Sequence, residues 1–248
     1  MSSSTAFAFP SINRPIDYPE EWLVAAAETY DYSGIVSLSN CSGSLVRFDD
    51  SLPEDKAMVL TNGHCVKMID PGVVLKDQAV SRSFTILGKT AKALGSIRAD
   101  RLLFATMTKT DMALYRVRES YLDIEEDFGI VALTLARSAP VLDSEIEVLS
   151  GYWKRGYSCN VEAIVPKLQE GNWFFADSVR YSRPGCNVIG GTSGSPVVQA
   201  GTRTVVAVNN TINENGRRCL QNNPCEIAED GTIFFAGPIA FVESYFSE

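Results

Sequence analysis

The chain has 248 residues, a net charge of −8 and a hydrophobic content of 45%. This length suits one compact unit or two small domains that share an interface, and it allows a substantial core. The excess of acidic residues argues against a nucleic-acid partner, because no basic face is available to displace counterions. No apolar run approaches the roughly 18 residues of a membrane span, so we expect a soluble protein without membrane contact.

The six cysteines are an even number, which is compatible with three disulfides and an oxidising compartment. A metal site is the alternative, but the chain has no Cys-x-x-Cys pair and only one histidine. We therefore expect no metal and no cofactor. No signal peptide is visible in the first ten residues. Six unpaired cysteines also occur in cytosolic enzymes, so the composition alone does not decide; we expect a secreted or periplasmic protein whose leader was removed or omitted.

The first half of the chain begins with a non-periodic arm over residues 1–17. A short helix is predicted from Pro19 to Tyr30, because proline suits the first helical position and two acids follow it. The acidic segments 49–56 and 119–127 are predicted to be a solvated hairpin tip and a solvated connection. Short apolar runs between turns predict strands at 34–39, 43–48, 57–61, 83–87, 102–106 and 112–117.

The second half of the chain begins after a linker near residues 136–140. A hairpin turn is predicted at 169–172, and a short helix from Pro238 to Phe246. Turns recur at short intervals and helical periodicity is poor, which indicates an antiparallel all-β protein. Strands are predicted at 148–153, 160–168, 173–181, 196–198, 204–210 and 232–237.

The predicted hairpin also suggests a cysteine pairing. Folding the chain about Glu170 and Gly171 brings Cys159 near Cys186, so we favour a bridge between these two residues. Cys219 would then pair with Cys225 and close the short loop between them. A bridge between Cys186 and Cys219 remains the alternative, because connectivity does not follow from sequence.

The stretch from Ile189 to Val198 reads Ile-Gly-Gly-Thr-Ser-Gly-Ser-Pro-Val-Val and predicts a sharp turn that leads into a strand. Glycines let the backbone fold tightly and approach a ligand closely. Such a turn can direct successive N–H groups into one small space, which a developing oxyanion requires. Ser193 is therefore a candidate nucleophile.

A serine nucleophile needs a base whose pKa lies near the working pH, and histidine is the residue that meets this requirement. The only histidine is His64, within Leu-Thr-Asn-Gly-His-Cys-Val. Between His64 and Ser193 lies Asp111, which leads directly into an apolar Met-Ala-Leu-Tyr run. Asp100 and Asp123 compete for the same role, but neither opens such a strand.

These three motifs, in the order His, Asp, Ser, resemble those of the trypsin-like (chymotrypsin-fold) serine peptidases. The resemblance extends from about Ser33 to the C-terminus, and the Gly-x-Ser-Gly-Ser-Pro form is closer to bacterial branches. It implies two packed six-stranded antiparallel β-barrels, with a short helix near each end of the chain. An N-terminal arm and helix would occupy residues 1–30. The first barrel (31–136) would carry His64 and Asp111, and the second (137–248) Ser193.

The resemblance also implies a role for each residue. Ser193 would attack the scissile carbonyl, His64 would accept its proton, and Asp111 would orient the imidazole. The backbone N–H groups of Gly191 and Ser193 would form the oxyanion hole. Ser195, in the same turn, would be structural. The implied activity is that of a serine endopeptidase, acting as a monomer on protein or peptide substrates.

The resemblance has further consequences for a disulfide and for the substrate pocket, and the sequence departs from the animal digestive enzymes at some positions. The resemblance implies a Cys41–Cys65 bridge beside the histidine turn. Thr192 stands where those enzymes carry the aspartate that receives a new N-terminal ammonium, so we expect that activation switch to be absent. Asn187 and Asn209 fall at positions that would line the substrate pocket. Neither is an acid that would select Arg or Lys before the cut, and the substrate preference stays open.

Three other classes of protein share some of these features. Subtilisin-like hydrolases place a helix after the serine, whereas the residues after Ser195 are typical of a strand. The α/β-hydrolases require Gly-x-Ser-x-Gly and a histidine after the serine, and here the histidine comes first. A catalytically inactive binding module with a protease fold is the remaining alternative.

Overall fold

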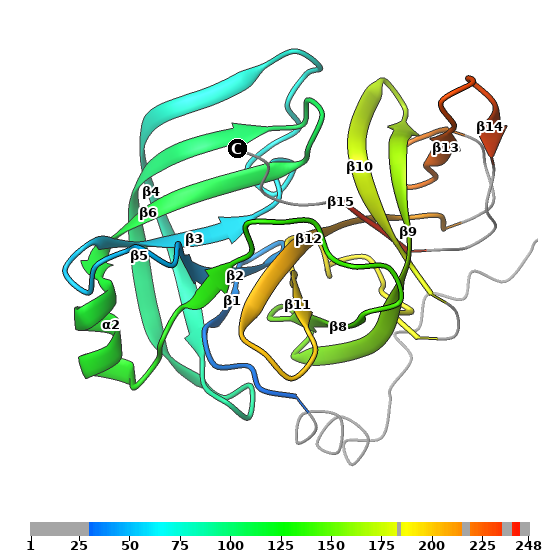
Figure 1. Cartoon of the computed structure of the whole chain (residues 1–248). Coiled ribbons are helices and arrows are strands. Elements are labelled where there is room, and N and C mark those ends of the chain that lie inside the picture. The colour runs from blue at the N-terminus through cyan, green and yellow to red at the C-terminus, as the bar shows by residue number, and fades with distance from the viewer. Residues whose placement is uncertain (1–29, 183–184, 215–218, 235–239, 244–248) are drawn as a thin grey trace, which may run out of the picture.

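The computed structural model describes residues 30–182, 185–214, 219–234 and 240–243. Within these ranges the chain is mostly β, with one short helix (Figure 1). No helix in the described ranges is long and apolar enough to cross a membrane.

Six strands of the first half pair in a closed ring. Antiparallel pairing runs in the order β1–β4–β5–β6–β3–β2 and returns from β2 to β1. The long β4–β5 hairpin is prominent on the left of Figure 1. The strands are β1 (Ile35–Ser37), β2 (Ser42–Arg47), β3 (Lys56–Thr61), β4 (Val74–Leu87), β5 (Ala93–Thr106) and β6 (Met112–Ser120).

Six strands of the second half form another closed ring. Here antiparallel pairing runs β8–β9–β10–β15–β12–β11 and returns from β11 to β8. The strands are β8 (Glu145–Ser150), β9 (Arg155–Glu170), β10 (Trp173–Tyr181), β11 (Pro196–Gln199), β12 (Thr204–Ile212) and β15 (Ala240–Glu243).

Three short strands lie outside the rings. Strand β7 (Leu133–Leu135) pairs in parallel with β2 of the first ring and β12 of the second, so it joins them. Strand β13 (Cys225–Ile227) pairs with the end of β9 and with β14 (Ile233–Phe234). Strands β13 and β14 thus extend the β9–β10 hairpin along its β9 edge, near the tip.

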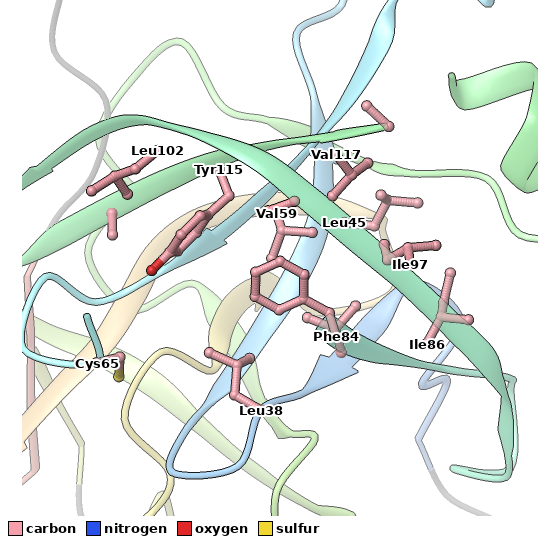
Figure 2. Packing of buried hydrophobic residues seen from close by; sticks show 14 of the residues in the cluster. Leu38, Leu45, Val59, Cys65, Phe84, Ile86, Ile97, Leu102, Tyr115 and Val117 are labelled. Atoms are coloured by element: carbon pink, nitrogen blue, oxygen red, sulfur yellow. The ribbon is translucent and has the colours of Figure 1, made fainter. Parts of the chain in front are cut away.

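Each ring encloses its own core because its strands alternate inward and outward residues. Strand β6 shows this pattern clearly, with Ala113, Tyr115 and Val117 buried and the residues between them half-buried. In the first ring Tyr115 packs edge-on against Phe84, with ring centroids 5.3 Å apart (Figure 2). A further buried cluster combines residues of both halves and fills the space between the rings: Val46, Leu60, Leu133, Leu135, Leu149 and Val205.

The segment 119–127, predicted to be a solvated connection, forms part of helix α2 (Tyr121–Phe128). The Ser120 hydroxyl accepts the Asp123 N–H, and the Asp123 carboxylate accepts the Ser120 N–H, which is a capping box. Gly129, at φ 67°, ends the helix. Buried Ile124 anchors it to the first core. The prediction was wrong because the acids cap the helix and cover its outer face.

The prediction of a helix from Pro238 to Phe246 is also wrong for the part of this segment that the structure describes. Ala240–Glu243 form β15, which lies between β10 and β12. Pairing on both edges completes the second ring and overrides local helical preference. The rest of that segment, and the predicted arm and helix up to residue 29, lie outside the described residues.

The other predicted strands are confirmed, although β4, β5 and β9 extend well beyond their predicted bounds and β8 ends at Ser150. Of the strand predicted at 232–237, only Ile233–Phe234 form a strand (β14), and residues 235–237 lie outside the described residues. The three disulfides are also the predicted ones. They join Cys41 to Cys65, Cys159 to Cys186 and Cys219 to Cys225, and so exclude the Cys186–Cys219 alternative.

Candidate active site

The turn that carries His64 follows β3 and fits closely against β5 and β6. A Cβ atom at Gly63 would collide with the carbonyl oxygen of Thr106, so a larger residue would push the turn outward. The Asn62 side-chain amide donates to the Asp111 carbonyl at 2.7 Å. The Cys41–Cys65 bridge ties the far side of the turn to β2. His64 is therefore fixed from both sides.

His64 and Asp111 form a close pair. The imidazole Nδ1 lies 2.5 Å from Asp111 Oδ2, and the His64 backbone N–H donates to Oδ1 at 2.9 Å. Burial opposes the imidazolium, but the charge and hydrogen bond of Asp111 outweigh it and hold the pKa of His64 above its ordinary value. Because Asp111 accepts from Nδ1–H, the neutral ring carries its lone pair on Nε2.

Ser193 sits in a loop of the second ring that packs against the first. The Ser42 N–H donates to the Ser193 carbonyl at 2.8 Å, and the Gly194 N–H donates to the Asn209 carbonyl at 2.9 Å. Gly194 has φ 78°, and a Cβ there would collide with the Ser42 carbonyl and the Thr61 hydroxyl. Glycine is required at this contact between the two halves.

The backbone N–H groups of this loop divide into two sets. Those of Thr192, Gly194 and Ser195 donate to backbone carbonyls. Those of Gly191 and Ser193 donate to no backbone acceptor within the described part of the chain. The loop of Ser193 thus has two N–H groups without a backbone acceptor among the described residues, and the Ser193 hydroxyl donates to the Asn210 carbonyl at 3.4 Å.

The Gly190–Gly191 peptide is oriented by Trp153, which follows β8. The indole Nε1–H donates to the Gly190 carbonyl at 2.8 Å. A trans peptide is planar, so its C=O and N–H point in opposite directions. The Gly191 N–H is therefore directed away from the indole.

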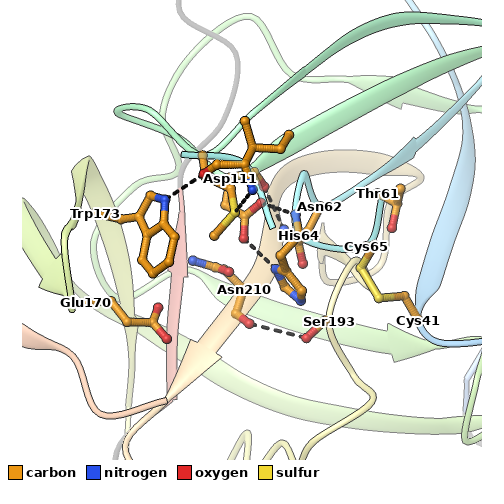
Figure 3. A network of polar contacts seen from close by, with 12 residues as sticks. Cys41, Thr61, Asn62, His64, Cys65, Asp111, Glu170, Trp173, Ser193 and Asn210 are labelled. Carbon is orange, nitrogen blue, oxygen red and sulfur yellow. Dashed lines mark hydrogen bonds and ion pairs between the residues drawn. A yellow bond between two sulfur atoms is a disulfide. The ribbon is translucent and has the colours of Figure 1, made fainter. Parts of the chain in front are cut away.

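One small cleft brings the candidate residues together. His64, Asp111 and Ser193 line it, with Asn210 of β12 beside them. Figure 3 shows the His64 ring between Asp111 and Ser193, and the Glu170 carboxylate facing the same space from the β9–β10 hairpin. These groups come from both rings, so the cleft lies where the two halves meet.

The competing residues have other partners. Asp100 forms a bidentate pair with Arg116, with both N–O distances at 3.0 Å, and Asp123 caps α2. Ser195 is fully buried, as expected of a structural residue. Of the three candidate aspartates, Asp111 is therefore the one that contacts His64.

The two predicted pocket residues are placed differently from each other. Asn187 is exposed and does not line the cleft with His64. Asn209 is buried, and its side-chain amide donates to the carbonyl and hydroxyl oxygens of Thr192, each at 3.1 Å. Its Oδ1 accepts the Tyr181 hydroxyl at 3.2 Å. The Asn209 side chain therefore supports the loop of Ser193 and does not face the cleft.

Sequence reasoning did not identify Glu170 or Trp153 as site residues. Glu170 was assigned only to a hairpin turn, and nothing local indicates that the hairpin reaches the cleft. Trp153 had been placed at the end of a strand, with no signal that it contacts the glycine loop. Both contacts depend on tertiary packing.

A comparison of the sequence with curated proteins finds no match. The fold is similar to that of a protease from Nocardiopsis, at 14% identity over 87% of this chain and 92% of that chain, with a TM-score of 0.50. The protease domain of MamO from Magnetospirillum magneticum matches at 14% identity, 87% and 93% coverage and a TM-score of 0.49. The family model for the trypsin-like peptidase domain matches residues 41–208. This match covers most of the chain, which therefore belongs to the trypsin-like peptidase domain family.

Proposed function

We propose that this protein is a serine endopeptidase that acts through an acyl-enzyme intermediate. The observation that carries the proposal is a cleft lined by the His64–Asp111 pair and by Ser193, whose loop holds two N–H groups, those of Gly191 and Ser193, without a backbone acceptor among the described residues. Acyl transfer requires a nucleophile, a base and donors for the oxyanion.

In the proposed reaction the Ser193 oxygen attacks the carbonyl carbon of the peptide while His64 Nε2 takes the hydroxyl proton. The Gly191 and Ser193 N–H groups stabilise the oxyanion that forms. His64 then donates the proton to the departing amine, which leaves the acyl group on Ser193. A water molecule then attacks the acyl group in the same way, with His64 again as the base, and releases the carboxylic acid product. Asp111 holds the imidazole in the required tautomer and stabilises its cation.

We also propose that the two rings of paired strands are the two six-stranded barrels of the chymotrypsin fold. The first would span residues 31–136 and the second 137–248, after an N-terminal arm and helix over 1–30. The closed pairings within each half support this division, as does the position of β7 immediately before the boundary.

Several finer assignments remain part of this proposal. Asn187 would contribute to the pocket for the residue before the cut. The two hydrogen bonds that Thr192 receives from Asn209 support a loop that needs no new N-terminus to order it. The three disulfides support a secreted or periplasmic location. We expect a monomer that acts on proteins or peptides, without a nucleic-acid partner, membrane contact, metal or cofactor.

A fluorophosphonate probe tests the proposal, because an activated serine displaces its fluoride and becomes phosphonylated. The wild-type protein should be labelled at Ser193 and should hydrolyse peptide esters. Ser193→Ala should abolish both signals, whereas Ser195→Ala should keep them. The alternative is an inactive binding module with the same fold. That alternative would be supported if a folded wild-type protein were neither labelled nor active.

A further inference from the structure

Glu170 is a buried acid in the candidate cleft that the proposed reaction does not use. It is the last residue of β9, and its side chain lines the same cleft as His64 and Ser193. Only 7% of the residue is exposed. The carboxylate points toward Asn210 and the space beside Ser193 (Figure 3).

Among the described residues, the cationic group that acts on this carboxylate is a protonated His64 in the same cleft. The Asn222 N–H donates to Oε1 at 2.6 Å, but no lysine or arginine in the described ranges forms an ion pair with Glu170. Burial accordingly raises the pKa of Glu170. A buried acid is normally paired, and here the open side of the group is the cleft.

The cleft beside Glu170 has apolar as well as polar walls. Met68, Met107 and Trp173 line it together with Thr211, Gln221 and Asn222. Apolar side chains beside a buried carboxylate are complementary to a side chain with an aliphatic stem and a cationic head. Lysine and arginine have this form.

The hairpin that carries Glu170 is held rigidly against the first ring. The Trp173 indole N–H donates to the Ile69 carbonyl at 2.8 Å. The Lys109 N–H donates to the Phe174 carbonyl at 3.1 Å, and the Ala176 N–H donates to the Lys109 carbonyl at 2.8 Å. The acid is therefore positioned by the fold before any substrate binds, which favours selective recognition.

We propose that Glu170 makes this cleft a binding site for a lysine or arginine side chain of the substrate. The proposal rests on the peptidase function above and adds a specificity residue to it. The side chain that enters is not the one directly before the cleaved bond, because the proposed pocket for that residue involves Asn187, which does not line this cleft. The preference for a cation should thus appear at another substrate position.

The test is a set of matched peptides in which lysine or uncharged norleucine occupies each position around one cleavage site. For wild-type protein, one position other than that directly before the cut should favour lysine by about 10- to 100-fold in kcat/KM, as expected for a hydrogen bond between charged groups. Glu170→Gln keeps the shape and the acceptor for Asn222, and should reduce the ratio to near one. Glu229→Gln, which removes the same charge from an exposed position of the same region, should leave the ratio unchanged.

A binding measurement separates this proposal from the proposed function. Calorimetry on the Ser193→Ala protein should show tighter binding of the favoured lysine peptide than of its norleucine partner, and Glu170→Gln in that background should remove the difference. Equal binding and equal turnover of the two peptides at every position would overturn the proposal while leaving the peptidase activity intact. Absence of turnover in wild-type protein, with the binding difference preserved, would refute the peptidase instead. If Glu170→Gln does not fold, the comparison in wild-type protein decides alone.

Discussion

Replacing Trp153 with phenylalanine should slow the chemical step while leaving substrate binding almost unchanged. The substitution removes the indole N–H that donates to the Gly190 carbonyl at 2.8 Å. That bond sets the plane of the Gly190–Gly191 peptide, and hence the direction of the Gly191 N–H. The oxyanion forms only as the reaction proceeds, so a misdirected donor raises the barrier more than it weakens the bound substrate.

The size of the effect follows from the bond that is lost. A neutral hydrogen bond contributes about 0.5–1.5 kcal/mol, which corresponds to roughly a 2- to 13-fold fall in kcat. Complete loss of an oxyanion donor costs about 3–4 kcal/mol and sets the upper limit. Phenylalanine keeps an aromatic ring beside Tyr152, whose centroid lies 4.9 Å from that of Trp153. Trp153 is 45% exposed, so the fold should tolerate the change.

The assay measures kcat and KM for Trp153→Phe, with Tyr152→Phe as the matched control, because that change removes a hydroxyl from the neighbouring ring. Affinity for a peptide aldehyde, which forms a tetrahedral adduct with the serine, should fall in parallel with kcat. Affinity for the peptide acid product should not. A kcat equal to that of wild type, or a loss confined to KM, would refute the reasoning about the peptide plane.

Three further predictions concern the candidate site and its frame. Ser193→Ala should abolish hydrolysis without lowering the melting temperature, whereas Ser195→Ala should retain activity; a dead Ser195→Ala protein that is still folded would reverse the assignment. Activity should be lost as pH falls through the His64 ionisation, above the ordinary value of 6.5, because the base must be neutral and its pKa is raised; a flat profile between pH 5 and 8 would contradict this. Reduction of the Cys41–Cys65 bridge should cost about 2–5 kcal/mol of unfolding free energy, measured by denaturant titration against the oxidised protein; peptide mapping that finds these thiols free would contradict the pairing.

The candidate residues of the site can be found from local patterns in the sequence. The Gly-Thr-Ser-Gly-Ser-Pro run needs a tight turn wherever it occurs, and the structure shows why Gly194 is required there. His64 was identified because it is the only histidine in the chain. The strands of the first half follow an alternation of apolar and polar residues, so their existence was predictable while their length was not.

The predictions failed where distant contacts outweigh local preference. The segment Ala240–Glu243 becomes a strand because β10 and β12 present open edges on both sides. Asn209 is predicted to line the pocket, and its side chain contacts Thr192, because a β-strand turns alternate side chains to opposite faces. Its neighbour Asn210 lines the cleft instead. Two adjacent residues of one strand therefore differ in role: Asn209 supports the loop of Ser193, and Asn210 lines the cleft.

Ser42 contacts several of the segments that form the candidate site. Its N–H holds the Ser193 carbonyl, and its own carbonyl accepts the Thr61 hydroxyl at 2.7 Å, just before the histidine turn. Its hydroxyl lies 3.0 Å from that of Ser150 and accepts the Tyr152 N–H at 3.1 Å, which places the turn that carries Trp153. A single buried residue of β2 therefore contacts the segments that position the nucleophile, the base and the peptide beside the oxyanion donors. Because each of these contacts is made by the backbone or by a short side chain, an error in the register of β2 would displace all three groups together.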